Sequence, residues 1–152
     1  MRRRAALTLA ALVAAGLLAG CAAMPDRLVA GTPRADIERA LGRPTATIDL
    51  PEGTRLQYSR QPAGQQVFNV ELDAQGRLRQ VDQVMDPAWF ARIEVDRWTR
   101  DDVLRLFGRP ALVERVALFD GDIWTYRYLD VSWPRQFHVH LDPAGVVRKL
   151  MH

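Results

Sequence analysis

The residues whose type and spacing best fit a chemical role are His138, His140 and Asp142, which stand at alternate positions near the C-terminus. Alternate residues of a strand project to one face, and two imidazoles with a carboxylate can ligate zinc. A zinc-binding periplasmic protein, or a hydrolase that uses His138 and His140, is therefore one interpretation. The internal repeat described below favours a simpler one, a polar sheet face without a metal, because the equivalent positions are polar in both copies. In the first copy they are Asn69, Glu71 and Asp73.

Other catalytic arrangements have less support in the sequence. The two serines, Ser59 and Ser132, lie outside any nucleophile-elbow sequence, and no glycine-rich phosphate loop is present. The adjacent carboxylates Asp101 and Asp102 are better explained as favourable charges at a helix start than as an acid and base pair. We therefore expect no catalytic residues, no metal, no cofactor and no small-molecule substrate, and we interpret the chain as a binding protein.

Cys21 is the single cysteine, and it follows a secretory signal. Residues 1–4 are cationic, residues 5–19 are apolar, and residues 18–21 read Leu-Ala-Gly-Cys, which resembles the lipobox of bacterial lipoproteins. The resemblance implies that residues 1–20 are removed and that Cys21 receives diacylglyceryl and N-acyl lipid. Residues 21–31 would then form a lipidated tether. Ala22, in place of the aspartate that commonly signals inner-membrane retention, favours the periplasmic face of the outer membrane.

Removal of residues 1–20 also cancels the basic charge of the precursor. Three arginines leave, so 21 minus 3, or 18, basic residues balance 18 acidic ones. No basic cluster remains that would indicate a nucleic-acid partner. The expected partners are the membrane, through the lipid, and a protein of the cell envelope.

Two sequence blocks occur twice and in the same order. Residues 32–44 return at 98–110, and residues 68–76 return at 137–145. Such self-similarity indicates two structural repeats, which we place at residues 32–85 and 86–152.

Each repeat begins with a helical pattern and continues with strands. Thr32 and Thr99 suit the N-cap of a short helix, and Gly42 and Gly108 suit its C-terminal cap. A further helix is expected after Asp86, with a partial counterpart before Thr32. Alternating apolar residues then predict six strands, at residues 55–60, 67–73, 77–84, 123–129, 137–142 and 146–151. The predicted fold class is α+β, with two repeated units that each pack a short helical pair on a three- to four-stranded antiparallel sheet.

This pattern resembles the SmpA/OmlA (BamE) domain. The resemblance lies in Gly31, Arg34, Asp36-Ile37 and Leu41-Gly42-x-Pro44. It returns in the second copy at Thr99, Asp102-Val103 and Gly108-x-Pro110. The chain departs from the family at Pro33 and at Arg97. The resemblance implies an outer-membrane lipoprotein that assists β-barrel assembly or envelope integrity. The tandem form is also similar in architecture to β-lactamase inhibitor proteins, which implies an inhibitor-like binder of a periplasmic enzyme as an alternative.

The candidate partner surface combines a polar sheet face with one loop. Trp133 and Arg135 belong to the loop, and these residue types are enriched at the centres of protein interfaces. The alternative for Trp133 is that it folds back over the sheet edge. The sheet face is predicted to point outward and is formed by Asn69, Glu71, His138 and His140.

Overall fold

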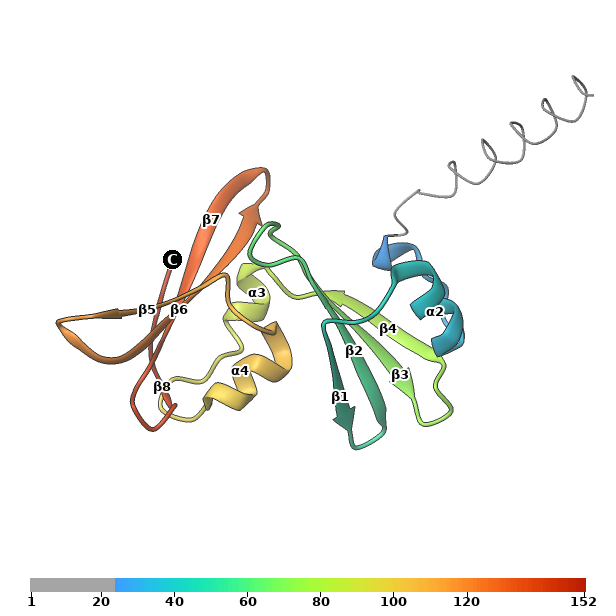
Figure 1. The fold of residues 1–152 in the computed structure, drawn as a ribbon, viewed down its shortest axis with the longest axis horizontal. Coiled ribbons are helices and arrows are strands. Elements are labelled where there is room, and N and C mark those ends of the chain that lie inside the picture. The colour runs from blue at the N-terminus through green and yellow to red at the C-terminus, as the bar shows by residue number, and fades with distance from the viewer. Residues whose placement is uncertain (1–23) are drawn as a thin grey trace, which may run out of the picture.

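A computed structural model describes residues 24–152 (Figure 1). The signal sequence, Cys21 and most of the tether therefore lie outside the described residues. Within them, no helix is both long enough and apolar enough to cross a membrane. The secondary structure is 47% strand and 18% helix, arranged as two four-stranded antiparallel sheets with a few short helices. The predicted fold class, α+β with helical pairs packed on sheets, is wrong in this respect, because the fold is dominated by its sheets.

The first sheet has the order β1-β2-β3-β4 and packs one face against a single α-helix. Its core joins residues of that helix and of three strands. The helix is α2 (Arg34–Leu41), and the strands are β1 (Ala46–Leu50), β2 (Gly53–Ser59), β3 (Val67–Asp73) and β4 (Leu78–Gln83). The buried apolar core residues are Ile37, Leu56, Val70, Leu72 and Leu78.

The second sheet has the order β5-β6-β7-β8 and holds the larger aromatic core. Phe90 stacks on Phe137 with ring centroids 4.1 Å apart, and the Tyr126 hydroxyl donates a hydrogen bond of 2.7 Å to the Gly108 carbonyl. The elements are α3 (Pro87–Phe90), α4 (Arg100–Phe107), β5 (Leu112–Val116), β6 (Phe119–Asp130), β7 (Trp133–Leu141) and β8 (Val147–Met151).

The expected helical pairs are reduced in both units. Before α2 there is only a 3-10 turn, η1 (Pro25–Arg27), and α3 is a single turn of four residues. Segments this short carry too few backbone hydrogen bonds to extend as helices. Each contributes only one buried residue: Pro25 in η1 and Phe90 in α3.

The two copies of the main helix begin differently. In α4 the predicted cap is present: the Thr99 hydroxyl accepts from the Asp102 amide, and the Asp102 carboxylate accepts from the Thr99 amide, a capping box. In α2 the prediction of Thr32 as N-cap is wrong, because Pro33 occupies the cap position and the Thr32 hydroxyl donates to the Val29 carbonyl instead. Pro33 therefore occupies the cap position, and its side chain cannot accept a hydrogen bond from the helix as a threonine side chain could.

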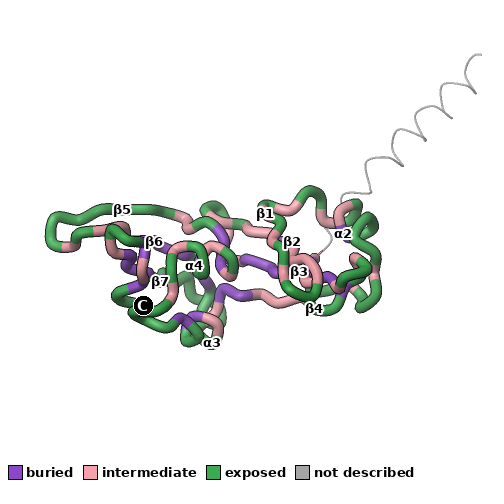
Figure 2. Tube along the Cα trace, turned by 90° about the horizontal axis from the view of Figure 1, so that it is seen from below, coloured by how far each residue is buried: buried purple, intermediate pink, exposed green. Residues whose placement is uncertain are grey.

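The six predicted strands are present with shifted ends, but the sequence did not predict β1 and β5. Both are edge strands. Every residue of β5 is exposed, so no buried apolar alternation marks it in the sequence. Figure 2 shows β5 as exposed along its whole length, whereas buried segments run through the middle of the molecule.

The two units stack as alternating layers. Figure 1 shows α3 and α4 between the two sheets, with α2 on the far side of the first sheet. The core of the second unit also includes Val67, Val84 and Met85, which precede the predicted boundary at residue 86. The second unit therefore packs its helices against both sheets.

Candidate functional site

The C-terminal end of α4 lies on the polar face of the first sheet. Asn69 Nδ2 donates a hydrogen bond of 2.9 Å to the Leu106 carbonyl, and Gln57 Nε2 donates to the same oxygen at 3.3 Å. The last carbonyls of a helix have no partner within it, so side chains of the sheet supply the missing donors. Both amide side chains are 1% exposed, which makes this contact part of the interior.

Arginines extend the contact from these amides toward the β1–β2 turn. Arg55 Nη1 donates to the Arg105 carbonyl at 2.9 Å, and Arg105 Nη2 donates to the Asp49 carbonyl, also at 2.9 Å. A guanidinium at the negative end of a helix dipole is favourable. Glu71 forms an ion pair with Arg55 and thereby orients it.

Gly108 ends α4 beside Gln57 of the first sheet. Its φ of +71° is the left-handed conformation that glycine adopts readily. A Cβ at Gly108 would lie 2.7 Å from Gln57 Oε1, whereas a Cβ at its repeat partner Gly42 would meet nothing within 4 Å. Gly108 therefore has a packing role that Gly42 lacks.

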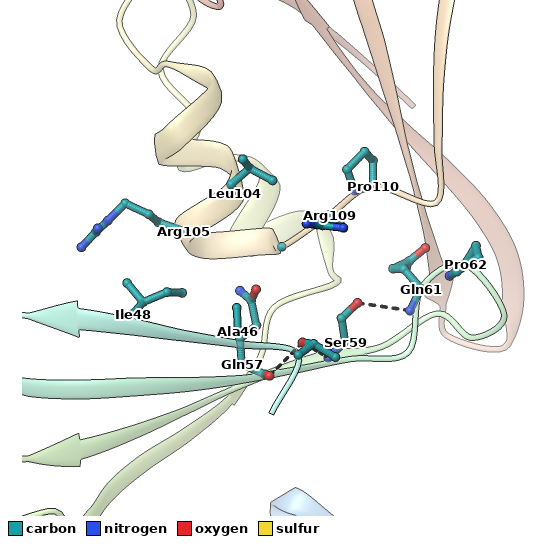
Figure 3. Close-up of a pocket in the computed structure, with 12 residues that line it drawn as sticks. Ala46, Ile48, Gln57, Ser59, Gln61, Pro62, Leu104, Arg105, Arg109 and Pro110 are labelled. Atoms are coloured by element: carbon teal, nitrogen blue, oxygen red, sulfur yellow. Dashed lines mark hydrogen bonds between the residues drawn. The ribbon is translucent and has the colours of Figure 1, made fainter. Parts of the chain in front are cut away.

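A cleft of about 470 Å³ opens beside this contact (Figure 3). Ile48 of β1 faces Leu104 and Arg105 of α4 across it. The strand register places Ile48 on the same sheet face as Arg55. The lining residues are Thr45, Ala46, Ile48, Gln57, Ser59, Gln61, Pro62, Leu104, Arg105, Gly108, Arg109 and Pro110.

The cleft is apolar with a cationic rim. Arg109 is exposed and forms no ion pair within the part of the chain that the structure describes. Neither a carboxylate nor a histidine lines the cleft. Of its two hydroxyl side chains, Ser59 accepts a hydrogen bond from the Gln61 amide and Thr45 donates one to the Gln57 carbonyl. The cleft therefore offers binding surface and positive charge, and it lacks a general base next to the serine.

One wall of the cleft is an edge strand. β1 pairs only with β2, so the backbone N–H and C=O groups along its other edge have no partner strand in the sheet. An edge strand can accept a further strand from a partner, with alternate side chains entering the neighbouring pocket. The β1 side chains that share the cleft face are Ala46 and Ile48.

The three residues of the predicted zinc set are not brought together. His140 is 9% exposed and packs edge-on against Phe119 at 5.0 Å, and His138 Nδ1 is hydrogen-bonded to Thr125 Oγ1 at 2.9 Å. A register shift after His140 interrupts the strand alternation before Asp142. Residues 24–152 contain no cluster of three His, Cys, Asp or Glu side chains that could hold a metal.

Asp142 instead closes a turn, as its repeat partner Asp73 does. The Asp142 carboxylate accepts from the Val146 amide at 2.9 Å and from Arg148 Nε at 2.8 Å. These donors lower its pKa below the ordinary carboxyl value, with the backbone amide as the largest cause. Asp73 similarly accepts from the amides of Gln75 and Arg77.

The predicted partner surface is divided by the structure. Asn69 is buried between the units, Glu71 is half-buried and His140 is buried beside Phe119, so the expectation that this face points outward is wrong for these three residues. Trp133 is 74% exposed, so it does not fold back over the sheet edge, and Arg135 is exposed as well. Whether Trp133 and Arg135 contact a protein stays a prediction.

Sequence reasoning missed the cleft residues. The alternation of Ala46, Ile48 and Leu50 is a strand signal, but it spans only five residues after a proline. Nothing in the sequence indicates that α4 comes to lie opposite Ile48. The repeated Gly-Arg-Pro motif is the one local signal, because it places Arg109 directly after the helix end.

Comparison with known proteins identifies no family. No family model matches the sequence, and no curated protein matches it significantly. Among solved structures, the chain is similar to the crystal structure of a DUF4309 family protein, YjgB, from Bacillus subtilis subsp. subtilis str. 168. The two share 13% identity over 78% of this chain and 75% of that one, with a TM-score of 0.31. A likeness of this size identifies neither a family nor a function.

Proposed function

We propose that this protein is a lipid-anchored protein of the outer membrane, on its periplasmic face, that binds an extended segment of another envelope protein in the cleft between its first sheet and α4. The cleft itself is the observation that carries the proposal. It combines an apolar wall, a free strand edge and two arginines, Arg105 and Arg109, without a catalytic group.

The chemistry of the cleft defines the segment that would bind. Ala46, Ile48 and Leu104 favour apolar side chains at alternate positions of an extended peptide. Arg105 and Arg109 favour a carboxylate beside them, because guanidinium groups form bidentate hydrogen bonds with carboxylates. The proposed ligand is therefore an extended apolar segment that carries an acidic residue.

The anchor and the cellular role rest on the sequence. The lipobox-like residues before Cys21 support lipid attachment, and the resemblance to the SmpA/OmlA domain supports a role in β-barrel assembly or envelope integrity. The anchor is tested by Cys21→Ala. The variant should become soluble or accumulate as precursor, and unchanged firm membrane association would contradict the anchor.

Peptide binding tests the cleft. Two fluorescent peptides with the same alternating valine and threonine residues, one with a central glutamate and one with a central lysine, are titrated with the purified chain and followed by anisotropy. The glutamate peptide should bind and the lysine peptide should not. Arg105→Gln with Arg109→Gln should remove this difference.

A matched pair of substitutions on one strand locates the binding surface. Ile48→Glu places a charge in the cleft, whereas Thr47→Glu places it on the opposite face of β1. Only Ile48→Glu should weaken binding of the glutamate peptide. Equal effects of the two substitutions, or equal binding of both peptides by the unaltered chain, would exclude the cleft as the site.

A further inference from the structure

The turn between β6 and β7 carries the most exposed aromatic side chain of the described residues. Val131 is 94% exposed and Trp133 is 74% exposed. Leu129, on the strand leading into the turn, is also exposed. The end of one hairpin thus carries three large exposed apolar side chains, with Leu129 on the opposite face of the strand pair from Trp133.

The fold gains little from an apolar residue in this turn. Val131 has a φ of +58°, a left-handed conformation that β-branched residues rarely adopt. Asparagine or glycine would be favoured there. The exposed Val131 side chain has no packing that would compensate for its backbone strain, so its apolar character points to a contact outside the chain.

Basic side chains lie next to the turn. A hollow of about 500 Å³ includes Arg127, Arg135, His138 and His152 in its lining, together with Gln65, Pro134 and Gln136. None of these lining residues is a carboxylate. Asp130 lies close by, with its carboxylate 4.0 Å from Arg135 Nε.

The turn faces the side of the molecule where the described chain begins. In Figure 1 the β6–β7 turn forms the top of the second unit, and η1, in blue, lies above α2 on the right. Cys21 precedes Met24 by three residues, a reach of about 10 Å when extended. A bilayer held by lipid on Cys21 would therefore lie on the side toward which the turn points.

We propose that the β6–β7 turn is a bilayer contact, in which Val131 and Trp133 enter the boundary between headgroups and acyl chains while Arg127 and Arg135 contact the phosphates of anionic lipids. Tryptophan favours this boundary because its ring is apolar and its indole N–H can stay hydrated. Arginine stems lie along apolar surface while their guanidinium groups reach anionic headgroups. The proposal rests on the lipid anchor of the proposed function and adds a second membrane contact that fixes the orientation of the protein.

Fluorescence quenching in vesicles tests this contact. The full chain, extracted from membranes in detergent, is reconstituted into vesicles of phosphatidylethanolamine and cardiolipin whose acyl chains are brominated near the headgroup. Trp133→Phe identifies the emission of Trp133 by difference from the other tryptophans. That component should be quenched in the unaltered protein, and the rest of the tryptophan emission should not be.

Two further variants examine the parts of the turn. Arg127→Gln with Arg135→Gln should reduce the quenching of Trp133 in these vesicles but not in vesicles of phosphatidylethanolamine and phosphatidylcholine. Leu118→Ser is the matched control, because Leu118 is fully exposed between β5 and β6, at a different turn. It should leave the quenching unchanged.

The possible failures can be told apart by flotation of the vesicles. If the protein floats with the vesicles and Trp133 is not quenched, the bilayer contact is wrong while the anchor stands. A change in Trp133 emission on addition of intact outer membranes, without quenching in the brominated vesicles, would indicate a protein partner at the turn and would also overturn the proposal. If the protein does not float, the anchor is wrong, and the bilayer contact fails with it.

Discussion

Asn69→Ala should destabilise the protein because Asn69 joins the two units. Its Nδ2 donates to the Leu106 carbonyl at 2.9 Å, and its Oδ1 accepts from Gln57 Nε2 at 3.1 Å. Each net hydrogen bond contributes about 1 kcal/mol, and leaving buried polar atoms without partners adds to the loss. The expected decrease in the free energy of unfolding is therefore about 2–3 kcal/mol.

Urea unfolding followed by tryptophan fluorescence measures this loss. With a slope of about 2 kcal/mol per molar urea, the midpoint should fall by roughly 1–1.5 M. Gln80→Ala is the control, since Gln80 pairs with Glu71 on the same sheet face but is exposed. It should change the free energy of unfolding by less than about 0.5 kcal/mol.

A second substitution at Asn69 distinguishes the effect of its hydrogen bonds from the effect of its side-chain size. Asn69→Asp keeps the size of the side chain but replaces the donor by an acceptor that faces the Leu106 carbonyl at the negative end of α4. It should cost at least as much as Asn69→Ala. If Asn69→Ala is no more harmful than Gln80→Ala, the hydrogen bonds to the helix end do not hold the units together.

Three further expectations concern backbone conformation and protonation. Gly108→Ala should lower the thermal unfolding midpoint more than Gly42→Ala, because both glycines have positive φ but only Gly108 would bring a Cβ against Gln57; equal shifts would contradict the close contact. Burial of the imidazole, followed by the positive charge nearby, lowers the pKa of His140 below its ordinary value of 6.5. As the pH falls, this imidazole is therefore protonated in the unfolded chain before it is protonated in the folded one. The free energy of unfolding should decrease as the pH drops below about 6.5. The urea midpoints measured above and below that pH should differ less in His140→Gln than in the unaltered protein. An equal difference in both proteins would show that other titrating groups cause the effect. Val131→Asn should raise the free energy of unfolding by about 1 kcal/mol, because asparagine tolerates the left-handed conformation, and an unchanged urea midpoint would show that Val131 is not strained.

Local chemistry accounts for the parts of the fold that depend on neighbouring residues. Thr99 and Asp102 form a capping box because both partners lie within one helical turn. The turns at Asp73 and Asp142 follow from a short side chain that accepts backbone hydrogen bonds within four residues. The lipobox-like sequence before Cys21 is likewise a local pattern, and it stays a prediction because it lies outside the described residues.

Helix length and the edge strands were not predictable in the same way. The pattern after Asp86 favours a helix, yet α3 stops after Phe90, whose ring is fixed by stacking on Phe137 of a distant strand. β5 has no buried face, so its place beside β6 is determined by backbone pairing alone. Contacts between residues far apart in the sequence override local propensity at both places.

The sequence by itself determined which strand positions are polar, whereas only the tertiary structure decided what covers them. Asn69 and His138 are equivalent in the repeat, and both lie on polar strand faces. The end of α4 covers Asn69, and the Leu106 carbonyl accepts its hydrogen bond, while His138 on β7 stays partly exposed. A sequence pattern records the side-chain type at each position, but the burial of that side chain depends on which element packs against it. The position of α4 depends on the carbonyl groups at its C-terminal end, which accept hydrogen bonds from the sheet of the other repeat.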